Sequence, residues 1–146
     1  MRIEDCHLVI TDVGPEGRSR VARHDRVSTV AAHGATVAPL WITPEGAPFA
    51  EIPPPGGLSW ILMEMKPDNA GGGEGLPNQF HTGTTTNYTV ILSGRAILHV
   101  QEGEVEVGPG DTVVHRPLGA PHRWSVPGPH NCVMACMMSS PAEIRS

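Results

Sequence analysis

The stretch from residue 75 to residue 124 constrains the fold of this chain most, because it contains two segments of similar design. The first segment, residues 75–94, carries His81 between two glycines. The second segment, residues 110–124, carries His122 after another glycine turn, and a short hairpin-like run separates the two. An inward-pointing histidine and glycine turns in each half predict paired hairpins that close one antiparallel β-barrel around a pocket.

Composition favours the same all-β architecture. The chain has 146 residues, which suits one domain with its own hydrophobic core. Charged residues make up 17%, whereas Gly (17) and Pro (15) are abundant, as expected for many short strands joined by tight turns. Hydrophobic runs between turn residues predict strands at residues 6–13, 19–24, 35–42, 58–65, 87–92, 95–101 and 112–116. Gly94, Gly110 and Gly119 are predicted turn positions that need backbone freedom.

The two segments resemble the paired motifs of the cupin superfamily. The first motif of that family, with its spacing kept, falls on Gly75, His81, Gly83, Asn87 and Gly94. The second falls on Gly110, Asp111, Pro117, Gly119 and His122, with one extra residue between its two pieces. Residues 81–88 are also similar to a segment of small single-domain cupins that have Asp where this chain has Asn87. The resemblance, over residues 58–138, implies a single cupin β-barrel (a double-stranded β-helix or jelly roll) with extra N-terminal strands.

The chain divides into two parts within one structural domain. Residues 1–57 contain the N-terminal strands and a Pro-rich loop at residues 44–57, which is expected to be a surface loop or a pocket rim. Residues 58–140 make up the barrel itself. The resemblance implies that the leading strands pack on the barrel or pair across a dimer, and a homodimer is the expected assembly.

The resemblance also bears on metal binding. Typical cupins hold a divalent metal with His, His, Glu and His, and the corresponding positions here are His81, Gly83, Asn87 and His122. Glycine offers no ligand and a neutral amide oxygen brings no charge, so a site for Fe, Mn, Ni or Zn would have a reduced ligand set. His115 would supply a third imidazole if its strand face points inward; otherwise it is an exterior residue.

Two chemistries and one non-catalytic role remain open for the pocket. Without a metal, His81 and His122 suit acid–base catalysis of the lyase, isomerase or cyclase type on an apolar, polyketide-like small molecule. With a metal, the chain would be an Fe- or Mn-dependent oxygenase; without catalysis, it would be a ligand-binding cupin. The residues expected to contact the substrate are Gln79, Thr85, Asn87, Tyr88, Trp124 and Met134.

Charge and cysteine content exclude other classes of partner. The net charge is −5 and the chain has a single lysine, Lys66, so no basic stripe is present for nucleic acid. No apolar run approaches the ~18 residues of a membrane helix, and the N-terminus has no signal-peptide pattern. Three cysteines without CxxC spacing predict free thiols and a cytoplasmic location.

Overall fold

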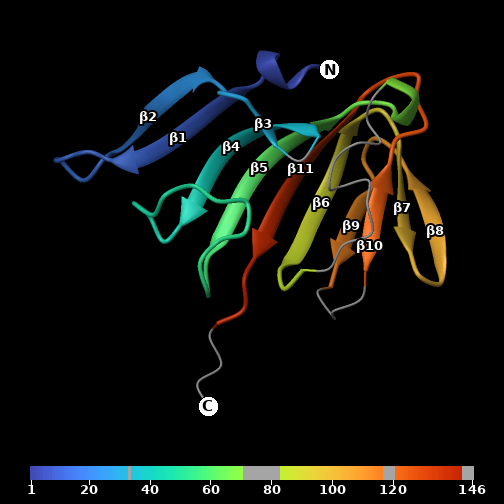
Figure 1. Ribbon diagram of the computed structural model, residues 1–146. Helices are drawn as coiled ribbons and strands as arrows, with labels where there is room; N and C mark the ends of the chain where they lie inside the picture. The colour runs from blue at the N-terminus through green and yellow to red at the C-terminus, as the bar shows by residue number, and fades with distance from the viewer. Residues whose placement is uncertain (33, 71–82, 117–120, 143–146) are drawn as a thin grey trace.

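A computed structural model describes residues 1–32, 34–70, 83–116 and 121–142, and the described part is built almost entirely of β-strands (Figure 1). Two short 3-10 helices, η1 and η2, accompany eleven strands. In chain order the elements are η1 (Ile3–Asp5), β1 (His7–Val13), β2 (Ser19–Arg26), β3 (Val30–Ala32), β4 (Ala35–Thr43), β5 (Leu58–Met65), η2 (Asp68–Ala70), β6 (Thr86–Ser93), β7 (Ala96–Val100), β8 (Gly103–Val107), β9 (Thr112–His115), β10 (His122–Ser125) and β11 (Cys132–Ser139). None of the helices in the described ranges could span a membrane.

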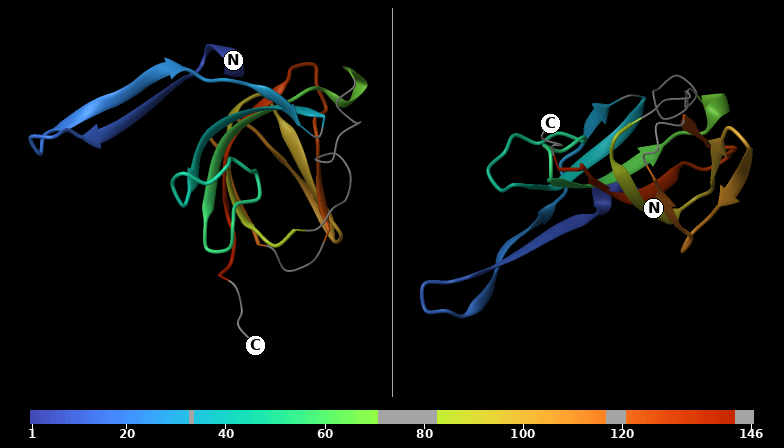
Figure 2. Two further views of the ribbon diagram at one scale, coloured as in Figure 1. Left: turned by 60° about the vertical axis from the view of Figure 1, so that its left-hand side comes forward. Right: turned by 90° about the horizontal axis from the view of Figure 1, so that it is seen from below.

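Two antiparallel sheets face each other and enclose the interior (Figure 2). The larger sheet has the strand order β3-β4-β5-β11-β6-β9, and the smaller has the order β10-β7-β8. Strands β1 and β2 form a separate two-stranded hairpin. This arrangement confirms the predicted all-β jelly roll with extra N-terminal strands. Because β4 pairs with β5, the large sheet continues across the predicted division at residue 57.

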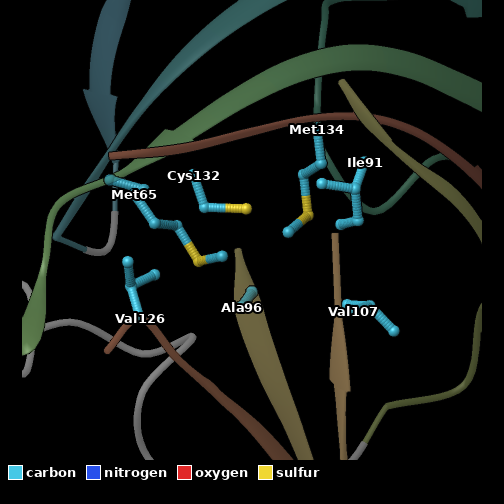
Figure 3. Packing of buried hydrophobic residues seen from close by; sticks show 8 residues of the cluster. Met65, Ile91, Ala96, Val107, Val126, Cys132 and Met134 are labelled. Carbon is cyan, nitrogen blue, oxygen red and sulfur yellow. The ribbon is translucent and has the colours of Figure 1, made fainter. Parts of the chain in front are cut away.

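Strand alternation places one set of side chains inside the barrel. On β11, the inward positions are four sulfur-containing residues at alternate positions of the strand: Cys132, Met134, Cys136 and Met138. Figure 3 shows Cys132 and Met134 among the apolar side chains of the core. Cys132 is 0% exposed and Met134 is 2% exposed, so both fill the core of the barrel.

The predicted strands agree with the structure to within two residues at each end for β1, β2, β4, β5, β6, β7 and β9. Strand β3 was not predicted, because its three residues are too few to show a hydrophobic period. In the first half of β5 burial alternates, with Ser59 and Ile61 buried and Trp60 exposed.

The predicted turn glycines Gly94 and Gly110 both have positive φ, 74° and 89° respectively. That left-handed conformation strains residues with a Cβ, so the turn assignment is confirmed at these two positions. The third, Gly119, lies outside the described residues.

Candidate functional site

Two histidines meet inside one end of the barrel. His115 ends β9 and His122 begins β10, at the lower end of the barrel in Figure 1. Their ring centroids are 3.8 Å apart with an interplanar angle of 41°. His122 is 5% exposed, and His115 lies on the same face of β9 as Val113, which packs on the core. His115 therefore points inward, which resolves the alternative that the sequence left open.

Asn87 lies beside this pair. Its Cα is paired with that of His115 across β6 and β9. The Thr85 hydroxyl donates a hydrogen bond of 2.7 Å to Asn87 Oδ1, and Thr85 is itself buried. The amide oxygen, which is the atom that would ligate a cation, is thus already engaged by Thr85. The structure brings Thr85 and Asn87 together with His115, as the predicted pocket required.

Apolar side chains form the inner wall around the pair. Trp124 lies two residues after His122 on the same strand, so both face the interior, and Trp124 packs against the core cluster. Met134 belongs to that cluster (Figure 3), and it pairs with Ile91, further along β6 than Asn87. Trp124 and Met134, two of the residues predicted to contact the substrate, therefore both lie on the inner face. Trp124 is nearer the histidines, and Met134 lies within the packed core.

Tyr88 is placed differently from the prediction. It follows Asn87 on β6, and adjacent residues of a strand point to opposite faces. Tyr88 is 43% exposed and pairs with Val114 and Met137 on the outer face of the large sheet. The expected place of Tyr88 in the pocket is therefore corrected: its hydroxyl cannot reach a ligand inside the barrel.

One residue at this end was missed by the sequence reasoning. Glu51 lies in the Pro-rich loop, where its backbone carbonyl accepts a hydrogen bond of 2.5 Å from the hydroxyl of Ser59. Ser59 is fully buried on the inner face of β5, paired with Met138. Glu51 Oε1 is also buried. The signal in the sequence was weak: Glu51 is one of two acidic residues, with Glu45, in a proline-rich stretch that was expected to be a surface loop or to rim the pocket.

The charge of Glu51 acts on the barrel interior. The pKa of the Cys136 thiol is raised by burial, lowered by a hydrogen bond from Thr89, and raised again by the nearby Glu51 carboxylate. Thr89 Oγ1 donates that bond to Cys136 Sγ over 3.4 Å. Since Cys136 points inward from β11, the Glu51 carboxylate adds a negative charge at the histidine-bearing end of the barrel.

The described residues do not fit a metal centre. In residues 1–32, 34–70, 83–116 and 121–142, no three His, Cys, Asp or Glu side chains are grouped closely enough to hold an ion. Within these ranges the cluster supplies two imidazoles, His115 and His122, and the neutral Asn87 oxygen, which also accepts a hydrogen bond from Thr85. A tight catalytic metal usually needs three protein ligands. No step of the chemistry is therefore assigned to a metal.

The described residues do not include every predicted site residue. His81 and Gln79 lie outside the described residues. His99 is on the other face of the small sheet, where its Nε2 is 2.7 Å from Ser125 Oγ and its Nδ1 is 3.0 Å from Glu104 Oε2. His99 therefore holds strands β7, β8 and β10 together on that face.

Comparison with known structures supports the fold. The cupin domain of Cnp3 from Schizosaccharomyces pombe matches with a TM-score of 0.59 and 10% identity, over 92% of this chain and 87% of that one. A Cupin 2 conserved barrel domain protein from Salinispora arenicola CNS-205 matches with a TM-score of 0.56 and 16% identity, over 83% of this chain and 88% of that one. A structure from Acidithiobacillus ferrooxidans ATCC 23270 matches over only 56% of this chain and 49% of its own length, with 19% identity and a TM-score of 0.46, which is too partial to bear on activity.

Sequence comparison identifies the family. No match was found among curated proteins. The family model described as "Cupin domain" matches residues 62–138, which is more than half of the chain and includes β6 to β10. The matched range also contains His115, His122 and Asn87, the residues that meet at one end of the barrel. The chain therefore belongs to the cupin family.

Proposed function

We propose that this chain is a small-molecule-processing enzyme in which His115 and His122 act as an acid–base pair on an apolar substrate. The observation that carries the proposal is the 3.8 Å contact between the two rings inside an apolar barrel end. Two cationic rings at that separation would repel by about 4 kcal/mol at an effective dielectric constant of about 20. The pair therefore holds one proton more readily than two, which provides one neutral base and one cationic acid.

Such a pair suits lyase, isomerase or cyclase chemistry. The neutral imidazole would take a proton from carbon while the cationic imidazole gives its proton to the oxygen or leaving group, so charge is conserved within the site. Trp124 and the sulfur-containing side chains of the inner wall provide an apolar surface for the substrate. His81, expected in the pocket from the motif, is a further candidate for proton transfer.

The first prediction tests proton transfer without knowledge of the natural substrate. The purified protein is incubated in D₂O with a panel of apolar ketones and enones, and deuterium incorporation at carbon is measured by mass spectrometry. We expect exchange by the parent, and a loss of at least ~100-fold in the His115→Gln and His122→Gln variants. His130→Gln, in an exposed loop, is the matched control and should retain full exchange.

Two outcomes would contradict the acid–base proposal. Exchange that survives both inner substitutions would place the reactive groups elsewhere. Exchange or turnover that a chelator abolishes and added iron restores would favour the oxygenase alternative. A compound that binds tightly but shows no exchange or other conversion would favour the non-catalytic ligand-binding alternative.

A further inference from the structure

Three polar side chains are connected on the outer face of the smaller sheet, away from the histidine pair inside the barrel. His99 Nε2 lies 2.7 Å from Ser125 Oγ, and His99 Nδ1 lies 3.0 Å from Glu104 Oε2. The three residues come from the three neighbouring strands β10, β7 and β8 (Figure 1). A hydroxyl, an imidazole and a carboxylate in this order, each within hydrogen-bond reach of the next, are the arrangement that activates a serine nucleophile.

The strand register holds these three residues on one face. A two-residue turn at residues 101–102 joins β7 to β8, so the pairing of His99 with Glu104 is set by the turn. On its other side His99 is paired with Arg123 of β10. Ser125 follows Arg123 by two residues and therefore lies on the same face. The inward residues of β10, His122 and Trp124, lie on the opposite face.

Exposure increases from the serine to the carboxylate. Ser125 is 7% exposed, and the side chains of His99 and Glu104 are 13% and 63% exposed. The bond between the hydroxyl and the imidazole is therefore shielded from water, which strengthens it. The next residue, Val126, donates its N–H to Asp68 Oδ1 over 3.0 Å and accepts the Asp68 N–H over 2.9 Å. These bonds fix the backbone beside the serine before any substrate binds.

The carboxylate determines which nitrogen of His99 carries the proton. An ionised carboxylate only accepts hydrogen bonds, so the neutral imidazole donates its Nδ1–H to Glu104. Nε2 then keeps its lone pair and accepts the hydrogen bond of the Ser125 hydroxyl. This is the tautomer in which an imidazole can take the proton of a serine nucleophile. The order of the hydrogen bonds therefore prepares His99 as a base for Ser125.

We propose that Ser125, His99 and Glu104 form a second reactive centre, which transfers short acyl groups from small esters to water. Ser125 is the nucleophile, His99 is the base and then the acid, and Glu104 is a positioning residue. The small exposed area of Ser125 restricts the acyl group to short, unbranched ones such as acetyl. Arg123, paired with His99 on this face, brings a positive charge near the carbonyl oxygen, where negative charge develops.

The reaction has two halves, acylation and deacylation of the serine. Ser125 Oγ forms a bond to the ester carbonyl carbon while its proton moves to His99 Nε2. The bond from that carbon to the ester oxygen then breaks, and the alcohol leaves with the proton. Water next attacks the acyl-serine and gives a proton to His99. The bond from the carbon to Oγ breaks and Oγ takes that proton, so ester and water have become acid and alcohol.

The second prediction concerns covalent capture of Ser125. The protein is treated with 4-nitrophenyl acetate and, separately, with the small reagent methanesulfonyl fluoride, and peptide mass spectrometry locates the modified residue. We expect release of 4-nitrophenol and modification at Ser125. Ser125→Ala should lose both, and His99→Gln should slow modification at least ~100-fold. Glu106→Gln is the matched control: it removes a carboxylate from the same face of β8, where it bonds to Arg95, and should react like the parent.

The positioning role of Glu104 has a spectroscopic test. In Glu104→Gln the side-chain amide can donate to Nδ1, which favours the His99 tautomer that carries its proton on Nε2 and is no base for the serine. The ¹⁵N NMR shifts of His99 should show the Nδ1–H tautomer in the parent and in Glu106→Gln, and a larger share of Nε2–H in Glu104→Gln. Modification of Ser125 should slow at least ~10-fold in Glu104→Gln while circular dichroism stays native.

Three results would overturn this second centre. A parent that hydrolyses the ester no faster than buffer and carries no label would show that the three residues only tie the strands together. A label on another residue, such as Lys66 or His130, would place the reactivity elsewhere. A label on Ser125 that forms as fast in His99→Gln as in the parent would show that the imidazole does not activate the serine. If Ser125→Ala fails to fold, the labelled position in the parent and the rate in His99→Gln still decide.

Discussion

Asn87 shows how one hydrogen bond determines the chemistry open to a side chain. At the position where the cupin motif has a charged carboxylate, this chain has an amide whose oxygen accepts a bond from Thr85. That bond uses one lone pair of a neutral oxygen, which is a weaker ligand for a cation than the charged carboxylate of the motif. Negative charge at this end of the barrel comes instead from Glu51, on a loop far from the motif in sequence.

The third prediction tests where the Glu51 carboxylate lies. Burial is the largest cause of the raised pKa of Cys136, and the Glu51 charge adds to it. Removing that charge in Glu51→Gln should therefore lower the pKa of Cys136. In a Cys6→Ser, Cys132→Ser background, the pH dependence of thiolate absorbance or alkylation would report this shift for Cys136 alone. Glu45→Gln, in the same loop, should leave it unchanged; an equal shift in both variants would contradict the placement of Glu51.

The face of the sheet on which a side chain lies was predictable from the sequence only for residues on the same strand, because successive side chains alternate between the two faces. His122 and Trp124 were predicted on one face because they are two residues apart on one strand, and the structure agrees. Parity also implied that the neighbours Asn87 and Tyr88 could not both face the pocket, and the motif-based prediction overlooked this. The inward direction of His115 depends on its pairing with Asn87, a register that the sequence does not contain.

The turn between β6 and β7 illustrates how a single glycine permits a close approach between elements. At Gly94 φ is 74°, and a Cβ there would collide with the backbone carbonyl oxygen of Asn131, just before β11. Gly110 also has positive φ, but a Cβ there would meet open space. Substitutions at the two glycines therefore distinguish the free-energy cost of backbone strain, present at both, from that of a steric clash, present only at Gly94.

The fourth prediction compares Gly94→Ala with Gly110→Ala. The left-handed conformation alone should cost each variant about 1–2 kcal/mol of unfolding free energy. Gly94→Ala should lose clearly more, because the backbone of Asn131 must also move. Urea denaturation followed by circular dichroism gives both values. Equal losses in the two variants would show that the approach of the Asn131 backbone to this turn is not tight.

At the level of elements, the local sequence pattern predicted where strands occur along the chain, but not how they are arranged in space. Alternation and turn residues located β1, β2, β4, β5, β6, β7 and β9 because these signals are short-range, and they missed the three-residue β3. The direction in which the β1–β2 hairpin projects has no local signal, since among the described residues its strands pair with each other and with no strand of the barrel.

Across the whole molecule, the packed core and the proposed proton-transfer site occupy opposite ends of the barrel. One end is filled by a cluster that includes Met65, Val126 and Cys132, all less than 10% exposed (Figure 3). The other end holds His115 and His122 with Asn87. A densely packed end can hold in place the imidazole pair that we propose for proton transfer at the other end. Substitutions in the packed end should therefore change unfolding free energy more than catalysis.

The last prediction uses the thiol in the packed end as a probe of global stability. Burial raises the pKa of Cys132 from 9.0 to about 11 in the folded protein. The unfolded chain therefore ionises this thiol first as the pH rises. Its contribution to stability is fully present below pH 9 and is lost as the pH rises to about 11. The unfolding free energy of the parent, measured by urea denaturation at fixed protein concentration, should decrease over that interval.

Two variants separate ionisation from packing in that measurement. Cys132→Ala removes the ionisable group, so its unfolding free energy should decrease less steeply between pH 9 and 11 than that of the parent. Val126→Ala opens a similar gap in the same cluster but keeps the thiol. It should lose about 2 kcal/mol at every pH while keeping the pH dependence of the parent. Matching slopes in Cys132→Ala and the parent would mean that the Cys132 thiol is not shielded from water in the folded barrel.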